Sequence, residues 1–391
     1  MKVRTGIDRI LDGDFHSRFA GKRIGLICGA SGLSRDFRMT ADILHDMFRV
    51  TALFAPEHGA RGVLAPGEKV RDGVDAATGL PVYSLFEDFI FSVDENQRDS
   101  AYMPQALAQT DLLVFDMQDV GSRYFTYVST LFYCMKACGQ RGIPLVVLDR
   151  PNPIGGTVQG NTGSPELSSF IGLTRVPIRH GMTVGELARY YNGEYGLMCP
   201  LTVVMLDGWN RGMFYTDTGL PFVKPSPNLP TMDAITVYNG TCLFAGTNVS
   251  EGRGTTTPFT TVGAHYICPE KLARELNALH IPGIAFSPAY FIPQFSKYAG
   301  QVVYGVQLHL TDARILDPVS LGVRMMRKIQ EMYPQQFAFT PPKEGNRWHI
   351  DLASGTEELR LGPSDPQVIL ERWQREAQAF LPLYEKYRLY D

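Results

Sequence analysis

The sequence predicts an α/β protein, in which a mostly parallel β-sheet covered by helices is followed by a smaller α+β domain. In the first half of the chain, short aliphatic and β-branched runs alternate with helical patterns, which is typical of a parallel sheet. Four prolines within 220–230 indicate a stiff connection, and a length of 391 residues favours two domains. We therefore expect one domain over 1–230 and a second over 231–391.

Five apolar runs are the candidate strands of the sheet. They span 23–28, 50–54, 112–117, 144–148 and 201–206. Between the third and the fourth run, 125–142 is predicted to be a helix, because apolar residues recur at helical spacing and a glycine ends the pattern. Another helix is expected to begin at Thr183, because Thr183 and Glu186 have the spacing of a capping box.

The second domain combines a strand with helices. The segment 302–310 is predicted to be a strand, and 318–333 an amphipathic helix that begins after Asp317. The segment 366–390 has the pattern of a long terminal helix. We expect a bend near Pro382, because proline lacks the backbone N–H that a helix interior uses.

A polar loop follows each of the first four predicted strands. These loops are 29–32, 57–62, 118–124 and 149–156. Right-handed crossovers place the carboxyl ends of parallel strands at one edge of the sheet, so we expect the loops to share one crevice. The second loop brings a carboxylate, an imidazole and a guanidinium together in Glu57, His58 and Arg61.

The composition excludes several classes of protein. Lys and Arg number 37 against 40 Asp and Glu, without runs of either sign, so neither a nucleic-acid surface nor an anionic-membrane surface is expected. The apolar runs are far shorter than the roughly 20 residues that cross a bilayer. The first nine residues lack the apolar core of a signal peptide. We expect a cytoplasmic protein, or a periplasmic or secreted one if an export signal has been removed.

No metal and no cofactor are expected. The histidines form no His-x-x-x-His or His-x-His pair, and the six cysteines include no Cys-x-x-Cys pair. Gly25, Gly29 and Gly32 resemble a dinucleotide-binding turn, but their spacing departs from Gly-x-Gly-x-x-Gly, so a simple tight turn is the favoured interpretation. The Gly-x-Ser-x-Gly elbow of serine hydrolases and the P-loop motif are absent from the sequence.

Two further polar runs have both a functional and a structural interpretation. Asp116, Asp119 and Arg123 at the end of the third strand fit either an active site or an ion network that pins the loops. The run 248–259 combines hydroxyls and glycines with Arg253, and fits either a loop that grips a ligand or a plain surface loop.

Taken together, four motifs resemble those of the exo-β-N-acetylmuramidase family, which works in bacterial cell-wall recycling. The motifs are Pro56-Glu57-His58-Gly59-x-Arg61-Gly62, Phe115-Asp116-x-Gln118-Asp119-Val120-Gly121-x-Arg123-Tyr124, Leu148-Asp149-Arg150-Pro151-Asn152-Pro153 and Ser250-Glu251-Gly252-Arg253-Gly254-Thr255-Thr256. The resemblance implies a Rossmann-like catalytic domain, a smaller auxiliary domain and an active-site cleft between them. It also implies an exo-acting glycoside hydrolase that releases N-acetylmuramic acid from the non-reducing end of peptidoglycan fragments, with Glu57 as the catalytic residue.

Glycoside hydrolysis needs an acid that protonates the leaving oxygen and a second group that stabilises the oxocarbenium-like centre. Glu57 is the candidate acid, and His58 is a candidate to orient it or exchange protons with it. Asp116 or Asp119 is the candidate second carboxylate, which would activate water or align the acetamido group of the substrate for attack. Retaining, inverting and substrate-assisted mechanisms all stay open.

The lactyl carboxylate of muramic acid suits a planar guanidinium, which binds carboxylates in a bidentate manner. We expect at least one of Arg61, Arg123 and Arg253 to bind it. The other candidates for substrate binding in the motif loops are Gln118, Tyr124, Asn152, Asn248, Glu251 and Thr255.

Two other functions are alternatives. A non-catalytic protein would bind muramic-acid saccharides or muropeptides without turnover, and a sugar- or nucleotide-dependent transferase would be stabilised by a nucleotide. A carboxylate flanked by a histidine at a rigid strand end favours the enzyme, because a binding protein has little use for that pair. The expected partners are peptidoglycan-derived saccharides, and no oligomeric state is predicted.

Overall fold

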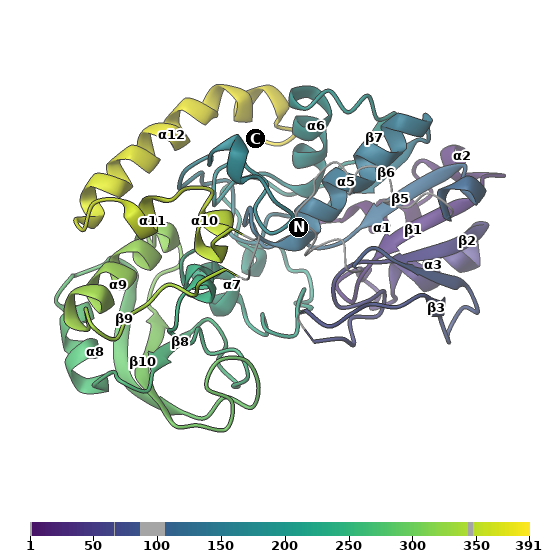
Figure 1. The fold of residues 1–391 in the computed structure, drawn as a ribbon. Coiled ribbons are helices and arrows are strands. Elements are labelled where there is room, and N and C mark those ends of the chain that lie inside the picture. The colour runs from purple at the N-terminus through teal and green to yellow at the C-terminus, as the bar shows by residue number, and fades with distance from the viewer. Residues whose placement is uncertain (1, 66, 87–105, 343–346) are drawn as a thin grey trace.

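A seven-stranded sheet forms the centre of the N-terminal part of the computed structural model, which describes residues 2–65, 67–86, 106–342 and 347–391 (Figure 1). Its strands are β1 (Ile24–Cys28), β2 (Val50–Ala55), β3 (Gly73–Val74), β4 (Pro81–Ser84), β5 (Leu112–Asp116), β6 (Leu145–Leu148) and β7 (Leu201–Val204). All five predicted strands are confirmed. The short strands β3, at the sheet edge, and β4, beside it, had no recognisable sequence signal.

The strand order is β3-β4-β2-β1-β5-β6-β7, and only the edge strand β3 runs antiparallel to its neighbour. The six parallel strands, numbered in chain order, therefore lie as 3-2-1-4-5-6, which is the Rossmann arrangement. The order reverses between β1 and β5. A ligand is expected beyond the carboxyl ends of the strands at that point.

Helices cover the sheet, so its central strands are buried on both faces. Every residue of β1 and β5 is buried, as expected for continuous apolar runs in a parallel sheet. Among the described residues of this part, the α-helices are α1 (Gly6–Leu11), α2 (His16–Phe19), α3 (Thr40–Met47), α5 (Thr126–Arg141) and α6 (Val184–Glu194). The predicted capping box is confirmed, because Glu186 N donates to Thr183 Oγ1 at 3.2 Å and Thr183 N donates to the Glu186 carboxylate at 2.9 Å.

The C-terminal part is smaller and combines helices with an antiparallel sheet of order β8-β10-β9. Its elements are α7 (Met232–Thr241), β8 (Thr261–Ala264), α8 (Pro269–Asn277), β9 (Ile284–Phe291), β10 (Val303–Leu310), α9 (Pro318–Met332), α10 (His349–Ser354), α11 (Glu358–Leu361) and α12 (Pro366–Tyr387). The predicted strand and the two predicted helices are confirmed. Pro382 lies inside α12.

The end of the chain returns to the N-terminal part. Helix α12, yellow in Figure 1, packs against both α9 and α6. Beyond it, the Tyr390 hydroxyl donates a 2.6 Å hydrogen bond to the buried carboxylate of Asp149, which directly follows β6. The two parts of the chain are therefore held together by the terminal helix as well as by the proline-rich connection at 220–230.

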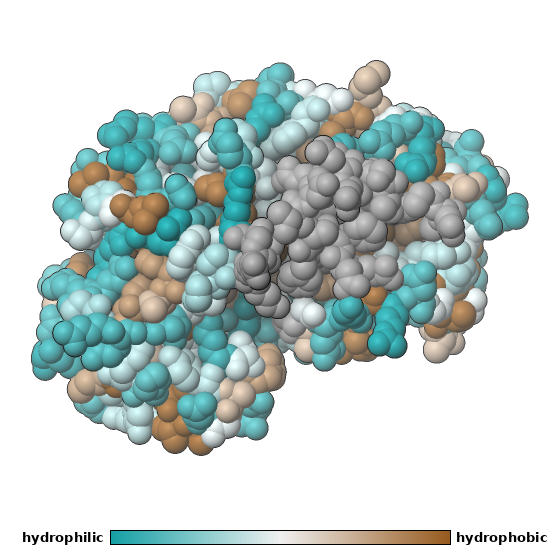
Figure 2. Space-filling model, viewed as in Figure 1, coloured by the Kyte–Doolittle hydropathy of each residue, from teal (hydrophilic) through white to brown (hydrophobic). Residues whose placement is uncertain are grey.

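On the face seen in Figure 2, hydrophobic residues are scattered among hydrophilic ones. Within the described ranges, no helix is both long enough and apolar enough to cross a membrane.

Candidate active site

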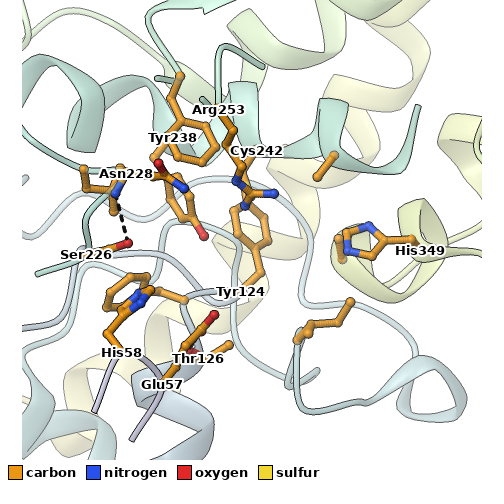
Figure 3. A pocket seen from close by; sticks show the side chains of 16 residues that line it. Glu57, His58, Tyr124, Thr126, Ser226, Asn228, Tyr238, Cys242, Arg253 and His349 are labelled. Atoms are coloured by element: carbon orange, nitrogen blue, oxygen red, sulfur yellow. Dashed lines mark hydrogen bonds between the residues drawn. The ribbon is translucent and has the colours of Figure 1, made fainter. Parts of the chain in front are cut away.

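A cavity of about 130 Å³ lies where the N-terminal and C-terminal parts meet. The loop after β2, the segment at the start of α5, the proline-rich connection and the C-terminal part all contribute to its lining. The polar side chains around it are Glu57, His58, Tyr124, Thr126, Ser226, Asn228, Tyr238, Cys242, Arg253 and His349 (Figure 3). Glu57 is the one carboxylate among the described lining residues.

Glu57 is held by hydrogen bonds to both carboxylate oxygens. The Thr126 hydroxyl donates to Oε2 at 2.6 Å, and the Gly67 backbone N–H donates to Oε1 at 3.2 Å. Figure 3 shows Glu57 and Thr126 side by side at one end of the cavity. Because Thr126 is the first residue of α5, its position is set by the helix, and the carboxylate is fixed at the rim of the sheet rather than free on a loop.

His58 is buried beside Glu57 in a strained backbone conformation. Its φ of 74° is rare for a residue other than glycine and costs about 1–3 kcal/mol, a strain that is common at functional sites. Its Nδ1 lies 3.0 Å from the Leu64 carbonyl oxygen, which only accepts, so Nδ1 carries the proton and Nε2 is the acceptor nitrogen. Burial, helped by the charge of Arg253, lowers the pKa of His58 despite the neighbouring Glu57. The ring is therefore neutral at pH 7.

Arg253 reaches the cavity from the loop before β8. Its Nη1 lies 3.2 Å from Oε1 of the buried Glu251, and its guanidinium lies over the Phe259 ring at 5.2 Å. Burial opposes the positive charge, but Glu251 together with Cys242, Tyr238 and Glu57 outweighs it, so the pKa of Arg253 is raised. Glu251 is also paired with Lys297 Nζ at 3.0 Å. The guanidinium is thus a fixed cation in the cavity.

Several lining residues could not be found from the sequence. His349 begins α10, and its ring is accessible from the cavity, yet the surrounding protein and the charges of Arg253 and Lys297 lower its pKa. Thr126, Asn228 and Tyr238 also line the cavity. None of them belongs to a recognisable motif, because only the fold brings these distant segments together.

Asp116 and Asp119 do not line the cavity. Asp116 is fully buried and forms an ion pair with Arg150, whose Nε lies 2.5 Å from Oδ1. Asp119 accepts a 2.7 Å hydrogen bond from the Gly121 backbone N–H and lies 3.1 Å from His180 Nε2. Both carboxylates belong to buried networks that connect the loops after β5 and β6. This arrangement matches the second interpretation of these residues, an ion network that pins the loops.

Two of the three candidate arginines bind other groups of the protein and do not line the cavity. Arg61 forms ion pairs with Asp42 and Asp75, both at 2.7 Å. Arg123 is buried and donates to backbone carbonyls, including that of Ser354 at 2.6 Å. Burial lowers the pKa of Arg123 to about 10. Arg253 alone of the three lines the cavity.

The remaining candidates separate into residues near the cavity and residues within the protein framework. Tyr124 lines the cavity and donates its hydroxyl to the Asn239 carbonyl. Thr255 lies just outside the cavity, in a groove that Asn228 also lines. The amide groups of Gln118, Asn152 and Asn248 donate to the carbonyls of Pro151, Met182 and Gln336, respectively, and none of these three lines the cavity.

The four predicted loops do share one edge of the sheet. Gln118 N donates to Ser31 Oγ at 3.3 Å, which connects the loops after β5 and β1. Only the loop after β2 and the end of the loop after β5 reach the cavity. In the described residues, no three His, Cys, Asp or Glu side chains lie close enough together to hold a metal ion.

Comparison with known proteins agrees with this architecture. The chain is 41% identical over its full length to the peptidoglycan β-N-acetylmuramidase NamZ of Bacillus subtilis, of which it covers 92%. Two crystal structures of DUF1343 family proteins from Bacteroides fragilis are also similar. One has a TM-score of 0.88 at 34% identity and the other 0.73 at 29%, and both alignments cover 100% of this chain and 99% of the other.

Two family models match consecutive parts of the chain. The N-terminal model of the exo-β-N-acetylmuramidase NamZ matches residues 24–233, and the C-terminal model matches 236–390. Together they cover nearly the whole chain, and they meet just after the proline-rich connection. This protein therefore belongs to the exo-β-N-acetylmuramidase NamZ family.

Proposed function

We propose that this glycoside hydrolase releases N-acetylmuramic acid from the non-reducing end of peptidoglycan fragments, with Glu57 as the general acid. The position of Glu57 carries the proposal. It lies at the strand ends of a Rossmann-like sheet, in a cavity that also holds a fixed cation, Arg253. Membership of the family supports the reaction and the substrate.

In the proposed reaction, the Glu57 carboxyl group gives its proton to the glycosidic oxygen as the bond to the anomeric carbon breaks. Water then adds its oxygen to the anomeric carbon and releases a proton, which restores the Glu57 carboxyl group. Thr126 and Gly67 hold the carboxyl group from both sides, so its orientation does not depend on the substrate. This arrangement lowers the barrier by fixing the acid before the substrate binds. Neither Asp116 nor Asp119 takes part, because both are committed to buried partners.

Arg253 is the proposed partner of the lactyl carboxylate of the substrate. Its guanidinium is charged and faces the cavity, whereas Arg61 and Arg123 are paired elsewhere. A guanidinium binds a carboxylate through two parallel hydrogen bonds, which a glucosamine unit without the lactyl group cannot form. The neutral rings of His58 and His349 leave the site with a single strong cation for this role.

Defined disaccharides test the proposed function. The purified protein should release free N-acetylmuramic acid from a disaccharide with this sugar at the non-reducing end, and should leave the reversed disaccharide intact. Binding of both without release would favour a non-catalytic sensor. Thermal stabilisation by a nucleotide, together with no hydrolysis, would favour a transferase. Either outcome would overturn the proposal.

A further inference from the structure

A groove of about 630 Å³ adjoins the cavity. Asn228 lines both the cavity and the groove, so the two spaces meet at this residue. The lining of the groove includes Val63 and Ala65, residues 254–256, and four residues of the segment 291–295. This space is much larger than the cavity that holds Glu57.

The groove offers exposed apolar surface and uncharged polar groups. Val63 is 80% exposed, Ile292 48% and Phe295 46%. Thr255 and Asn228 add a hydroxyl and an amide, and no charged side chain is among the described residues that line the groove. Large apolar side chains on a surface often mark a binding site, especially beside polar groups.

The side of the groove next to Phe295 is fixed to the loop that carries Arg253. Gly254 has a φ of 85°, and a Cβ atom there would lie 2.4 Å from the Phe295 carbonyl oxygen, so only glycine allows this approach. Gln294 N donates a 2.8 Å hydrogen bond to the Gly254 carbonyl. The groove and the cavity therefore share one rigid element.

Another part of the groove lining belongs to the loop that holds the acid. The Leu64 carbonyl oxygen accepts a hydrogen bond from His58 Nδ1, and its neighbours Val63 and Ala65 line the groove. In the same loop, the Gly67 backbone N–H donates to Glu57. A general acid must lie beside the oxygen of the leaving group. A sugar that leaves from Glu57 would therefore lie next to this loop.

We propose that the groove is the subsite for the leaving sugar, a neutral N-acetylhexosamine whose apolar face packs on Phe295 and Ile292 and whose hydroxyls contact Thr255 and Asn228. This inference rests on the proposed function. The uncharged lining favours a sugar over a stem peptide, because a peptide carries at least a terminal carboxylate that the groove does not complement.

Single substitutions in the groove test this assignment. Phe295→Ser and Ile292→Ser should each lower kcat/KM for the disaccharide with N-acetylmuramic acid at its non-reducing end by about tenfold, as expected for the loss of one apolar contact. The inhibition constant of free N-acetylmuramic acid, which would occupy only the cavity, should not change. Ile315→Ser is the matched control, because Ile315 is 60% exposed and lies outside the groove.

The outcomes separate the two proposals. If the wild type hydrolyses the disaccharide and both groove variants behave like Ile315→Ser, the groove assignment is wrong and the proposed function stands. A loss seen only with a disaccharide that carries a stem peptide would assign the groove to the peptide and overturn our inference. If the wild type hydrolyses neither substrate, the proposed function fails, and the groove assignment falls with it.

Discussion

Thr126, the first residue of α5, donates a 2.6 Å hydrogen bond to the carboxylate of Glu57, which follows β2. These residues are 69 positions apart in the chain. They meet because β1 lies between β2 and β5 in the sheet, so that the segments after β2 and β5 emerge at the same edge on either side of β1. The order of the strands reverses there, and the contact fixes the acid at that point.

Removal of the Thr126 hydroxyl should slow the reaction without unfolding the protein. Thr126→Val keeps the shape of the side chain but leaves Oε2 of Glu57 without this donor, and we expect kcat to fall about 10- to 100-fold through loss of orientation. Thr126→Ser should restore most of the rate. Thr130→Val is the control, because the Thr130 hydroxyl donates only to the Thr126 carbonyl in the same helix. Wild-type kcat in Thr126→Val would contradict the positioning role.

Arg253 should determine the preference for muramic acid over glucosamine. In Arg253→Ala, kcat/KM for a muramic-acid glycoside should fall about 10- to 100-fold, which corresponds to a lost hydrogen-bonded charge, while a glucosamine glycoside should be affected little. Arg61→Ala should leave the ratio of the two unchanged, because Arg61 is paired with Asp42 and Asp75. Equal ratios in wild type and Arg253→Ala would rule out this role.

Asp116 should matter for stability rather than for chemistry. Asp116→Asn leaves the buried Arg150 without its counter-charge, and the free energy of unfolding should fall by about 3–5 kcal/mol. The folded fraction should retain its kcat. The double variant Asp116→Leu with Arg150→Met should recover part of the lost stability, because it removes both charges. A loss of kcat in a variant that is still folded would contradict this prediction and indicate a role for Asp116 in catalysis.

The buried His58 should make the protein less stable in acid. Its pKa is lowered on folding, so the unfolded chain binds a proton more readily than the folded one as pH falls below about 6.5. The stability associated with the neutral ring is present above that pH and is lost below it. We expect the unfolding free energy of the wild type to drop more between pH 7 and pH 5 than that of His58→Gln. Denaturant titrations that give the same pH dependence of the unfolding free energy for both proteins would contradict this effect of His58.

The fold could be predicted from the sequence because its signals are local. The strands at 24–28 and 112–116 are continuous apolar runs, and the helix at 126–141 has apolar residues at helical spacing and a glycine at its end. Strands β3 and β4 were not predicted because they are short, lie at the sheet edge and next to it, and are not buried, so no apolar pattern marks them.

The site was only partly predictable. Glu57, His58 and Arg253 lie in loops whose residue order already indicates chemistry. Asp116 and Arg123 combine the same residue types, yet their partners are buried within the framework, and an ion network cannot be told from an active site by composition. Thr126 and His349 reach the cavity only through the packing of distant elements, which local patterns do not record.

The most direct test of our account is the turnover of a chromogenic β-N-acetylmuraminide by the wild type and by Glu57→Gln. The glutamine retains the size of the side chain and an oxygen that accepts from Thr126, but it has no acidic proton to give. We predict release of the chromophore by the wild type. For Glu57→Gln, we predict a fall in kcat on the natural disaccharide of at least about 10²-fold, with binding of N-acetylmuramic acid nearly unchanged. Wild-type kcat in Glu57→Gln would contradict the assignment of the acid.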